Sequence, residues 1–259
     1  LATMRTALQK AFTPLSDVIE SRSLPPIPHI NMTGETVLKH CGDVLFIRKR
    51  AHLKQRILLS GHMDTVYSAT HPFQKLSYVN ENCINGPGVA DMKGGLIVML
   101  HALMAFEASP YSEKLGWDVI INADEEIGSP ASSALLAEIA PNYEAAFVYE
   151  PAMTSKGTLA KGRRGSGKLT LIARGKAAHV GRAFDEGRNA ICFLAQAISA
   201  IDALNGKRDG VTINIGRIAG GEALNMVPDK AVTKFDVRIS QPEDEGWVRQ
   251  EIDTIVRKI

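Results

Sequence analysis

An alternation of apolar strands and helices is the feature of this sequence that most limits the folds it can adopt. The largely apolar segments 56–60, 117–123 and 145–149 predict strands, and the continuous apolar run 57–59 is typical of a sheet that is buried on both faces. The segment 94–107 predicts a helix between the first two runs, and Pro130 marks the start of another helix before the third. This order predicts an α/β fold with a mostly parallel sheet flanked by helices.

The N-terminal region is predicted to add one helix and two strands. Apolar residues recur at helical spacing as far as Phe12, and Pro14 ends that helix. The segments 18–24 and 44–50 predict strands. The expected loops are rich in Pro, or in Asn and Gly, and lie at 25–28 and 80–88.

A second pattern begins near residue 165. The predicted elements there follow the order strand, helix, strand, strand, helix, at 168–174, 189–204, 211–218, 231–239 and 243–258. This order is that of a ferredoxin-like α+β unit without its final strand. We therefore expect two domains, 1–164 and 165–259.

Composition excludes several classes of function. The 259 residues carry a net charge of +2, so we expect no nucleic-acid partner, which would need a basic surface. The longest apolar run, near 96–104, is interrupted by His101 and is too short to cross a bilayer, so we expect no membrane association. Cys41, Cys83 and Cys192 form no C-x-x-C pair, which predicts buried thiols in a reducing compartment.

Histidine or carboxylate side chains occur at four places that we expect at the C-terminal edge of the sheet, where open α/β sheets bind ligands. In chain order these are His62 with Asp64, Asp91, the run 124–126, and Glu150. Each place taken alone is also compatible with a helix cap, a solvated loop or an ordinary histidine. Clustered carboxylates raise one another's pKa unless a cation offsets them, and one imidazole with several carboxylates suits zinc or a similar metal. Together the four places predict a metal centre.

The same segments carry a family resemblance. The motifs SGHMDTV (60–66), GVADMKGG (88–95), DEEIGS (124–129) and YEP (149–151) resemble the two-zinc aminoacylase/carboxypeptidase family. That family includes glutamate carboxypeptidase, acetylornithine deacetylase and succinyl-diaminopimelate desuccinylase. The likeness covers residues 55–245, and the Tyr-Glu-Pro setting of Glu150 places the chain nearest to glutamate carboxypeptidase.

The resemblance implies a role for each residue of the predicted centre. His62 would ligate one of two zinc ions, with Asp64 behind it to fix the imidazole. Asp91 would bridge the two metals, and in the family the peptide that follows this aspartate is often cis. Glu125 would act as the general base, and cobalt or manganese could replace zinc. The remaining metal ligands implied by the family are Glu126 and Glu150.

The resemblance also implies three substrate-binding residues in the second domain, which acts in the family as a lid and dimerisation domain. His179 in GKAAHVG would reach across a homodimer interface and stabilise the oxyanion in the partner's site. Asn225 and Arg238 match positions that hold the substrate, and an arginine suits a carboxylate. An exposed histidine before a loop and an outward arginine on an alternating strand are the alternatives.

The resemblance predicts a metal-dependent hydrolase that cleaves an amide bond of an N-acyl amino acid or small peptide. A biosynthetic deacetylase or desuccinylase is the alternative within the family, and a non-catalytic dimerising or binding homologue is the alternative outside it. The joint presence of a predicted base and of several ligands counts against a pure binding role, and these residues are His62, Asp64, Asp91, Glu125, Glu126 and Glu150. The expected location is the cytoplasm, with the periplasm as the alternative, because the family occupies both.

Two phosphate-binding motifs are nearly matched and are rejected. The segment 162–169 approaches a phosphate-binding loop, but Leu169 stands where Ser or Thr would ligate magnesium, and a strand follows where a helix should begin. Gly86 and Gly88 suggest a dinucleotide fingerprint, but Asp91 replaces the third glycine and would repel a pyrophosphate.

One departure from the family concerns the final metal ligand, a histidine that the family supplies after the lid. No histidine of this chain stands in that position, and we expect the chain to be truncated at both ends relative to the family. We therefore predict that residues 1–259 bind the second zinc weakly and show little hydrolysis, which an activity assay on this polypeptide tests.

Overall fold

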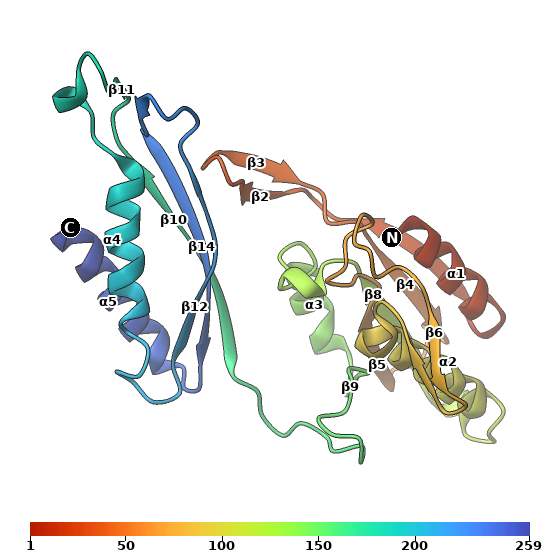
Figure 1. The fold of residues 1–259 in the computed structure, drawn as a ribbon. Helices are drawn as coiled ribbons and strands as arrows, with labels where there is room; N and C mark the ends of the chain where they lie inside the picture. The colour runs from red at the N-terminus through yellow and green to blue at the C-terminus, as the bar shows by residue number, and fades with distance from the viewer. The chain divides into compact units, whose positions relative to one another are not determined.

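The computed structural model describes residues 1–259, which form two compact units (Figure 1). Unit 1 consists of Leu1–Ile27 and Lys39–Leu159, and unit 2 of Pro28–Leu38 and Ala160–Ile259. The chain thus leaves unit 1 twice. The sequence-based boundary lay after residue 164, and no sequence pattern indicated that 28–38 belongs with the second unit.

Unit 1 is built on a five-stranded mixed sheet. In spatial order its strands are β1 (Val18–Ser23), β4 (Asp43–Lys49), β8 (Gly116–Asn122), β5 (Arg56–His62) and β9 (Ala145–Val148). Strand β5 pairs in parallel with β8 and β9, whereas β4 pairs antiparallel with β1 and β8. The predicted α/β class is confirmed, but the prediction of a mostly parallel sheet is wrong. Apolar runs identify buried strands, whereas strand direction depends on the connections, and helical crossovers here produce only the β8–β5–β9 part.

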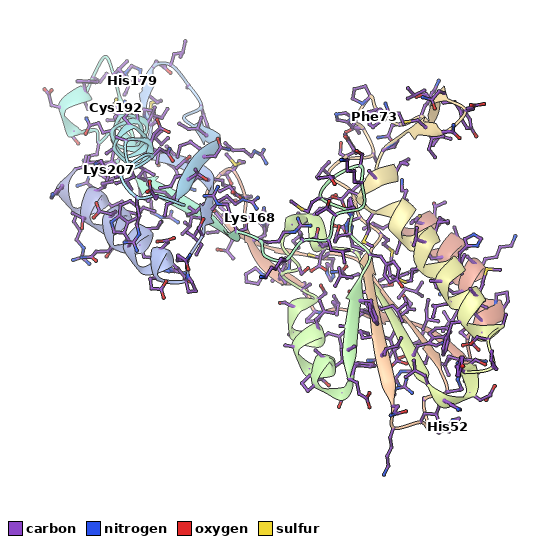
Figure 2. The ribbon with its side chains drawn as sticks, turned by 90° about the horizontal axis from the view of Figure 1, so that it is seen from below. His52, Phe73, Lys168, His179, Cys192 and Lys207 are labelled. Atoms are coloured by element: carbon purple, nitrogen blue, oxygen red, sulfur yellow. The ribbon has the colours of Figure 1, made fainter.

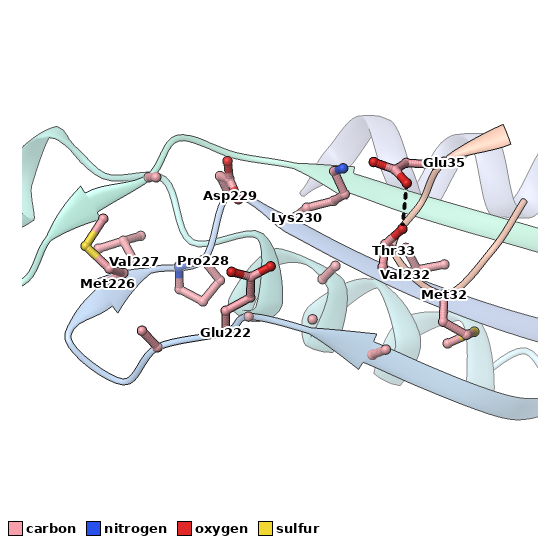
Figure 3. A pocket seen from close by; sticks show the side chains of 16 residues that line it. Met32, Thr33, Glu35, Glu222, Met226, Val227, Pro228, Asp229, Lys230 and Val232 are labelled. Atoms are coloured by element: carbon pink, nitrogen blue, oxygen red, sulfur yellow. Dashed lines mark hydrogen bonds between the residues drawn. The ribbon is translucent and has the colours of Figure 1, made fainter. Parts of the chain in front are cut away.

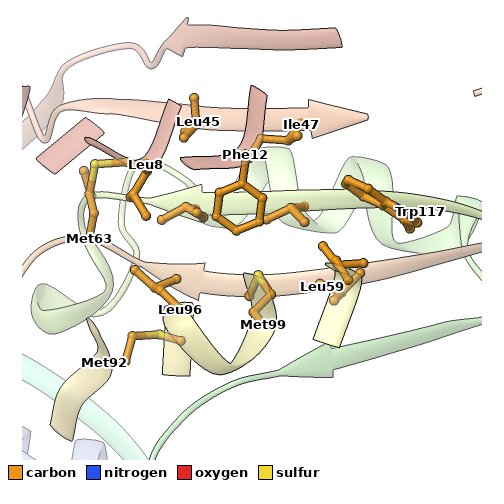
Figure 4. Packing of buried hydrophobic residues seen from close by; sticks show 14 residues of the cluster. Leu8, Phe12, Leu45, Ile47, Leu59, Met63, Met92, Leu96, Met99 and Trp117 are labelled. Atoms are coloured by element: carbon orange, nitrogen blue, oxygen red, sulfur yellow. The ribbon is translucent and has the colours of Figure 1, made fainter. Parts of the chain in front are cut away.

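Helices cover both faces of this sheet. The larger core joins α1 (Ala2–Phe12) and α2 (Gly94–Glu107) to one face, where Phe12, Met99 and Trp117 are completely buried (Figure 4). A smaller cluster on the other face joins sheet residues such as Phe46 to α3 (Ser133–Ile139). Alternate residues of β4 and β8 therefore enter opposite cores, as the pleat of a strand requires.

The helical segment Val89–Glu107 has the length and apolar composition of a membrane span, which differs from the sequence-based expectation for this run. Helices in the core of a soluble protein meet the same criteria. Here Leu96, Met99 and Leu103 pack into the main core of unit 1.

Two short hairpins occupy segments that were partly expected to be loops. The first consists of β2 (Ile27–Ile30) and β3 (Thr36–Lys39), and the second of β6 (Ser77–Asn80) and β7 (Cys83–Asn85). Polar, Pro- and Asn-containing strands lack the apolar alternation that identifies a strand in the sequence, which is why the predicted loops at 25–28 and 80–88 are partly wrong.

Unit 2 has a three-stranded antiparallel sheet in the order β10 (Gly165–Arg174), β14 (Lys230–Ile239) and β12 (Thr212–Gly220). Helices α4 (Ala190–Asp202) and α5 (Glu243–Lys258) complete the strand, helix, strand, strand, helix order predicted from the sequence. Their buried faces share one core with the sheet, which includes Ile201, Phe235 and Val248. A minor ladder adds β11 (Ala178–His179) and β13 (Met226–Val227).

The β2–β3 hairpin packs on the sheet of unit 2. The Lys234 ammonium donates a hydrogen bond to the carbonyl of Ile30. The turn residue Gly34 has φ +75°, and a Cβ there would lie 3.1 Å from Val232 and 3.2 Å from Ile172. The hairpin and the 219–232 segment enclose a hollow of about 780 Å³ (Figure 3).

The cysteines differ from the sequence-based prediction of buried thiols. All three are unpaired, and Cys41 is buried, but Cys83 and Cys192 are exposed. Cys83 lies in the exposed β6–β7 hairpin, and Cys192 lies in α4 (Figure 2).

Candidate metal centre

Three parallel strands carry the predicted site to one edge of the unit 1 sheet. Strand β5 ends at His62, β8 ends two residues before Asp124, and β9 ends two residues before Glu150. Because β5 pairs in parallel with both neighbours, these three ends point in the same direction. The predicted convergence of these segments at one edge is present in the structure.

His62 stands at the middle of this cluster. Its Nε2 atom lies 2.9 Å from Asp91 Oδ1, 3.7 Å from Glu150 Oε1 and 3.9 Å from Glu125 Oε2. The imidazole is 1% exposed, whereas the carboxylates of Asp91 and Glu125 are about half exposed, at 53% and 47%. The site therefore consists of a rigid buried imidazole that faces an accessible ring of carboxylates.

Asp64 organises the site from behind. Its Oδ1 lies 3.3 Å from His62 Nδ1, the ring nitrogen that faces away from the cluster. The same carboxylate accepts hydrogen bonds from the backbone N–H groups of Glu125, at 3.3 Å, and Glu126, at 3.0 Å. Asp64 thus contacts both the imidazole and the loop that carries both glutamates. The sequence motif contained no signal for this second contact.

Asp91 enters the cluster from a tight segment before α2. Gly88 has φ +65°, and a Cβ there would lie 2.3 Å from Thr65, so the turn requires glycine. The peptide between Asp91 and Met92 is cis, as the resemblance implied. Met92 is buried, and its sulfur accepts a hydrogen bond from the backbone N–H of His62 at 3.0 Å.

Asp124, the first of the three successive carboxylates, does not join the cluster. It is 1% exposed and accepts hydrogen bonds from the Ser132 hydroxyl at 2.6 Å and from the backbone N–H groups of Ala131 and Ser132. Asp124 therefore fixes the segment before α3. A serine eight positions downstream is too weak a signal to have identified this structural role from the sequence.

The electrostatics of the cluster follow from its crowding. Burial opposes protonation of His62, but its contacts with Asp64 and Asp91 outweigh burial and raise its pKa to about 9. Burial, with the repulsion of Asp91 and Glu125, raises the pKa of Glu150 to about 7. Burial and Asp91 also raise the pKa of Glu126. A cation would relieve this repulsion.

The donor set fits a divalent metal. Two groups of ligand atoms lie within 4.8 Å of one another: one combines His62, Asp91 and Glu126, and the other combines His62, Glu125 and Glu150. One imidazole with several carboxylate oxygens suits zinc, and also manganese or cobalt. The neighbouring Glu125 and Glu126 fall into different groups, so their side chains diverge, which a division into base and ligand requires.

The predicted substrate residues of unit 2 fall into two places. His179 in β11 is paired with Met226 in β13, and the carbonyl of the adjacent Asn225 accepts a hydrogen bond from Val180 at 3.0 Å. His179 and Asn225 are thus neighbours. Arg238 is near the far end of β14, eight residues beyond Lys230, and its Nε lies 2.6 Å from Asp236 Oδ1. The structure therefore does not bring Arg238 to the other two residues.

Family models match both units. The model described as "Peptidase family M28" matches residues 44–194, more than half of the chain, and the model described as "Peptidase dimerisation domain" matches 161–259. The chain belongs to the aminoacylase/carboxypeptidase family of metallopeptidases. This finding confirms the family inferred from the motifs.

Curated relatives agree with this family. Carboxypeptidase G2 from Pseudomonas sp. (strain RS-16) is 30% identical over 207 residues, which cover 78% of this chain and 49% of the relative. A putative succinyl-diaminopimelate desuccinylase from Mycobacterium tuberculosis is 30% identical over 223 residues, which cover 83% of this chain and 60% of that protein. The chain spans about half the length of the first curated relatives it matches.

Solved structures show the same fold. Aminopeptidase PepT from Bacillus cereus ATCC 10987 is 25% identical with a TM-score of 0.56, and the match covers 97% of this chain and 64% of that one. Human carnosine dipeptidase 1 is 15% identical with a TM-score of 0.70, over 99% of this chain and 68% of that one. At this identity the second likeness shows the fold alone.

Proposed function

We propose that this chain carries the metal centre and the lid of a hydrolase that cleaves an amide bond in an N-acyl amino acid or a small peptide. The observation that supports the proposal is the meeting of His62, Asp91, Glu125, Glu126 and Glu150 at one edge of the sheet. A centre with two zinc ions is part of the proposal, and Asp91 would be one of its ligands.

The proposed ligands are those that the sequence motifs indicated. His62, Asp91, Glu126 and Glu150 would hold the metals, which when bound polarise the scissile carbonyl and lower the pKa of water. Glu125 is the proposed general base: it is accessible, and its backbone is held by Asp64. Its carboxylate would take the proton from water and pass it to the leaving nitrogen.

The lid residues belong to the same proposal. His179 at the end of β11 and Asn225 just before β13 are neighbours in unit 2, an arrangement compatible with joint contact to one substrate molecule. A homodimer formed through unit 2 would bring them to a partner's metal centre, in line with the dimerisation-domain match. Arg238, at the far end of its strand and next to Asp236, would serve a separate part of the substrate.

Two other functions stay as alternatives. The 30% identity to a putative desuccinylase over 83% of this chain favours a deacylase of amino-acid biosynthesis as the second candidate. A binding protein that kept the fold has no use for a base such as Glu125. Metal analysis combined with a screen of dipeptides, N-acetyl, N-succinyl and N-acylglutamate substrates separates the three, because retained metal without any amide hydrolysis would favour the binding protein.

The decisive variant is Glu125→Gln, which keeps the shape of the side chain and removes its basicity. In the intact enzyme we expect unchanged metal content and a loss of kcat of about 10²–10⁴-fold. Glu138→Gln, an exposed change in α3, is the matched control and should leave both unchanged. A Glu125→Gln enzyme with the kcat of the unmodified protein would exclude Glu125 as the base.

A further inference from the structure

A second charged cavity lies in unit 1, at the edge of the sheet opposite the metal centre. It has a volume of about 160 Å³ and is lined by Arg48 at the end of β4, Arg56 at the start of β5, Asp118 in β8, and Asn142 and Tyr143 before β9. Arg56 and His62 occupy the two ends of β5, so the cavity lies roughly 20 Å from the metal cluster.

The cavity has more positive than negative charge. Asp118, whose side chain is 2% exposed, is its only carboxylate, and both of its oxygens already have partners. Oδ1 accepts a hydrogen bond from Arg56 Nη2, and Oδ2 accepts one from the Tyr143 hydroxyl. Burial and the Asp118 carboxylate raise the pKa of Tyr143, so the phenol stays neutral. Two guanidinium groups thus share one carboxylate.

Arg48 is the cation without a full partner. Its Nε lies 3.6 Å from Asp118 Oδ2, within ion-pair range but beyond a good hydrogen bond, and this buried N–H has no hydrogen-bond acceptor. The guanidinium is held in place by the ring of Phe46, whose centroid is 4.4 Å from Arg48 Cζ. A buried donor without an acceptor is costly, and in Arg48 this applies to Nε alone, because the side chain as a whole is 36% exposed.

We propose that this cavity binds a small tetrahedral oxyanion of the size of phosphate. The anion accepts hydrogen bonds from the Arg48 guanidinium, which forms the charge-assisted contacts that arginine makes with phosphate. The side-chain amide of Asn142 lines the same space and offers a neutral donor. The anion restores electrical balance to the group formed by Arg48, Arg56 and Asp118.

The test is calorimetric titration of the purified protein with inorganic phosphate at constant ionic strength, maintained with sodium chloride. We expect saturable binding that Arg48→Gln weakens at least about tenfold. Arg22→Gln is the matched control, because Arg22 Cζ lies 4.4 Å from the centroid of the same Phe46 ring but the residue does not line the cavity. The affinity of this variant for phosphate should equal that of the unmodified protein. Ala51→Phe, which fills the space and keeps every charge, should also abolish binding.

A fourth variant separates this cavity from the metal centre. His62→Ala removes the central ligand of the metal cluster, and phosphate binding in the cavity should persist in it. Loss of phosphate binding in His62→Ala would place the anion on the metals and overturn the proposal. Two further results would also overturn it. One is the absence of saturable binding by the unmodified protein. The other is phosphate binding by Arg48→Gln and Ala51→Phe that is as tight as that of the unmodified protein, with circular dichroism spectra that show both variants to be folded.

Discussion

At the scale of single residues, the site depends on how His62 is held. Its two ring nitrogens face Asp64 and Asp91, and the ring is almost completely buried. The pairing of Asp64 with His62 was implied by the family resemblance, because a His-x-Asp spacing taken alone is a weak signal, and the structure shows the two side chains in contact. The hydrogen bonds that Asp64 accepts from the backbone of residues 125–126 were not predictable from the sequence. They depend on the packing of β5 beside β8 and not on any local spacing.

Metal binding should release protons in a pH-dependent way. In the metal-free protein the pKa of His62 is raised to about 9 and that of Glu150 to about 7. A metal ion must therefore displace one proton from the site when the pH lies between these two pKa values, and two protons when the pH lies below the pKa of Glu150. The zinc affinity should therefore fall about tenfold per pH unit from 9 to 7, and more steeply below. Titration calorimetry in buffers of different ionisation enthalpy measures the released protons, and a pH-independent affinity would contradict this assignment.

At the scale of elements, sequence patterns predicted the long helices and the buried strands closely. Helix α2 begins and ends at the predicted residues, Gly94 and Glu107. Sheet direction and the two short hairpins were not predictable, because they depend on chain connections and on partners far away in the sequence. Two residues of α2 also make close contacts with other elements of unit 1 that were not predictable from the sequence.

Gly95 is one of these contacts. A Cβ at this position would lie 1.9 Å from the carbonyl oxygen of Tyr149, the residue before Glu150. Gly95→Ala should therefore displace the end of β9, cost roughly 1–3 kcal/mol of stability and weaken metal binding. Gly246→Ala in α5, where a Cβ meets nothing within 4 Å, should instead stabilise by about 0.5–1 kcal/mol. Urea unfolding and zinc titration of both variants measure the difference, and equal stability of the two would refute it.

Glu107 at the end of α2 is the other contact. Its carboxylate accepts a hydrogen bond from Arg50 Nη1 at 2.8 Å and another from Trp117 Nε1 at 2.7 Å. Burial opposes its ionisation, but these contacts outweigh burial and lower its pKa. The pKa of Glu107 is thus lower in the folded state than in the unfolded state, where it is about 4.3. The stabilisation from these contacts is therefore fully present above this unfolded-state pKa, and it is lost as the pH falls through the pKa of the folded state.

Glu107→Gln would leave the buried Arg50 without its counter-ion. The expected cost at pH 7 is about 3–5 kcal/mol, and the loss of stability on acidification should become less steep. Urea denaturation from pH 7 to pH 3 measures both effects. A variant whose stability changes with pH as in the unmodified protein would show that Glu107 does not contribute in this way.

At the scale of the whole molecule, the motifs predicted the family and the cluster of site residues, and the order of elements predicted the fold of unit 2. The sequence did not predict that unit 2 is built from two separate segments of the chain. The 28–38 hairpin lacks a strong apolar pattern and is separated from β14 by most of the chain, so only the folded structure reveals that it covers Ile172 and Val232.

The hairpin should therefore contribute to the stability of unit 2. A polypeptide of residues 160–259 alone exposes the surface that surrounds Gly34 and loses the Lys234 hydrogen bond to Ile30. We expect a lower urea midpoint for this fragment and partial recovery on addition of a synthetic 28–38 peptide. A peptide in which Ile30 is replaced by Asp is the control, and an unchanged midpoint with the native peptide would show that the hairpin is dispensable.

The early position of this hairpin in the chain also affects biosynthesis and gene history. The ribosome releases residues 28–38 long before the strands of unit 2 exist, so the hairpin must wait without its final partner while unit 1 emerges between them. Unit 2 therefore cannot be transferred between proteins as one uninterrupted stretch of coding sequence. Recombination that exchanged residues 160–259 alone would leave behind a strand pair fitted to the surface of the former unit 2.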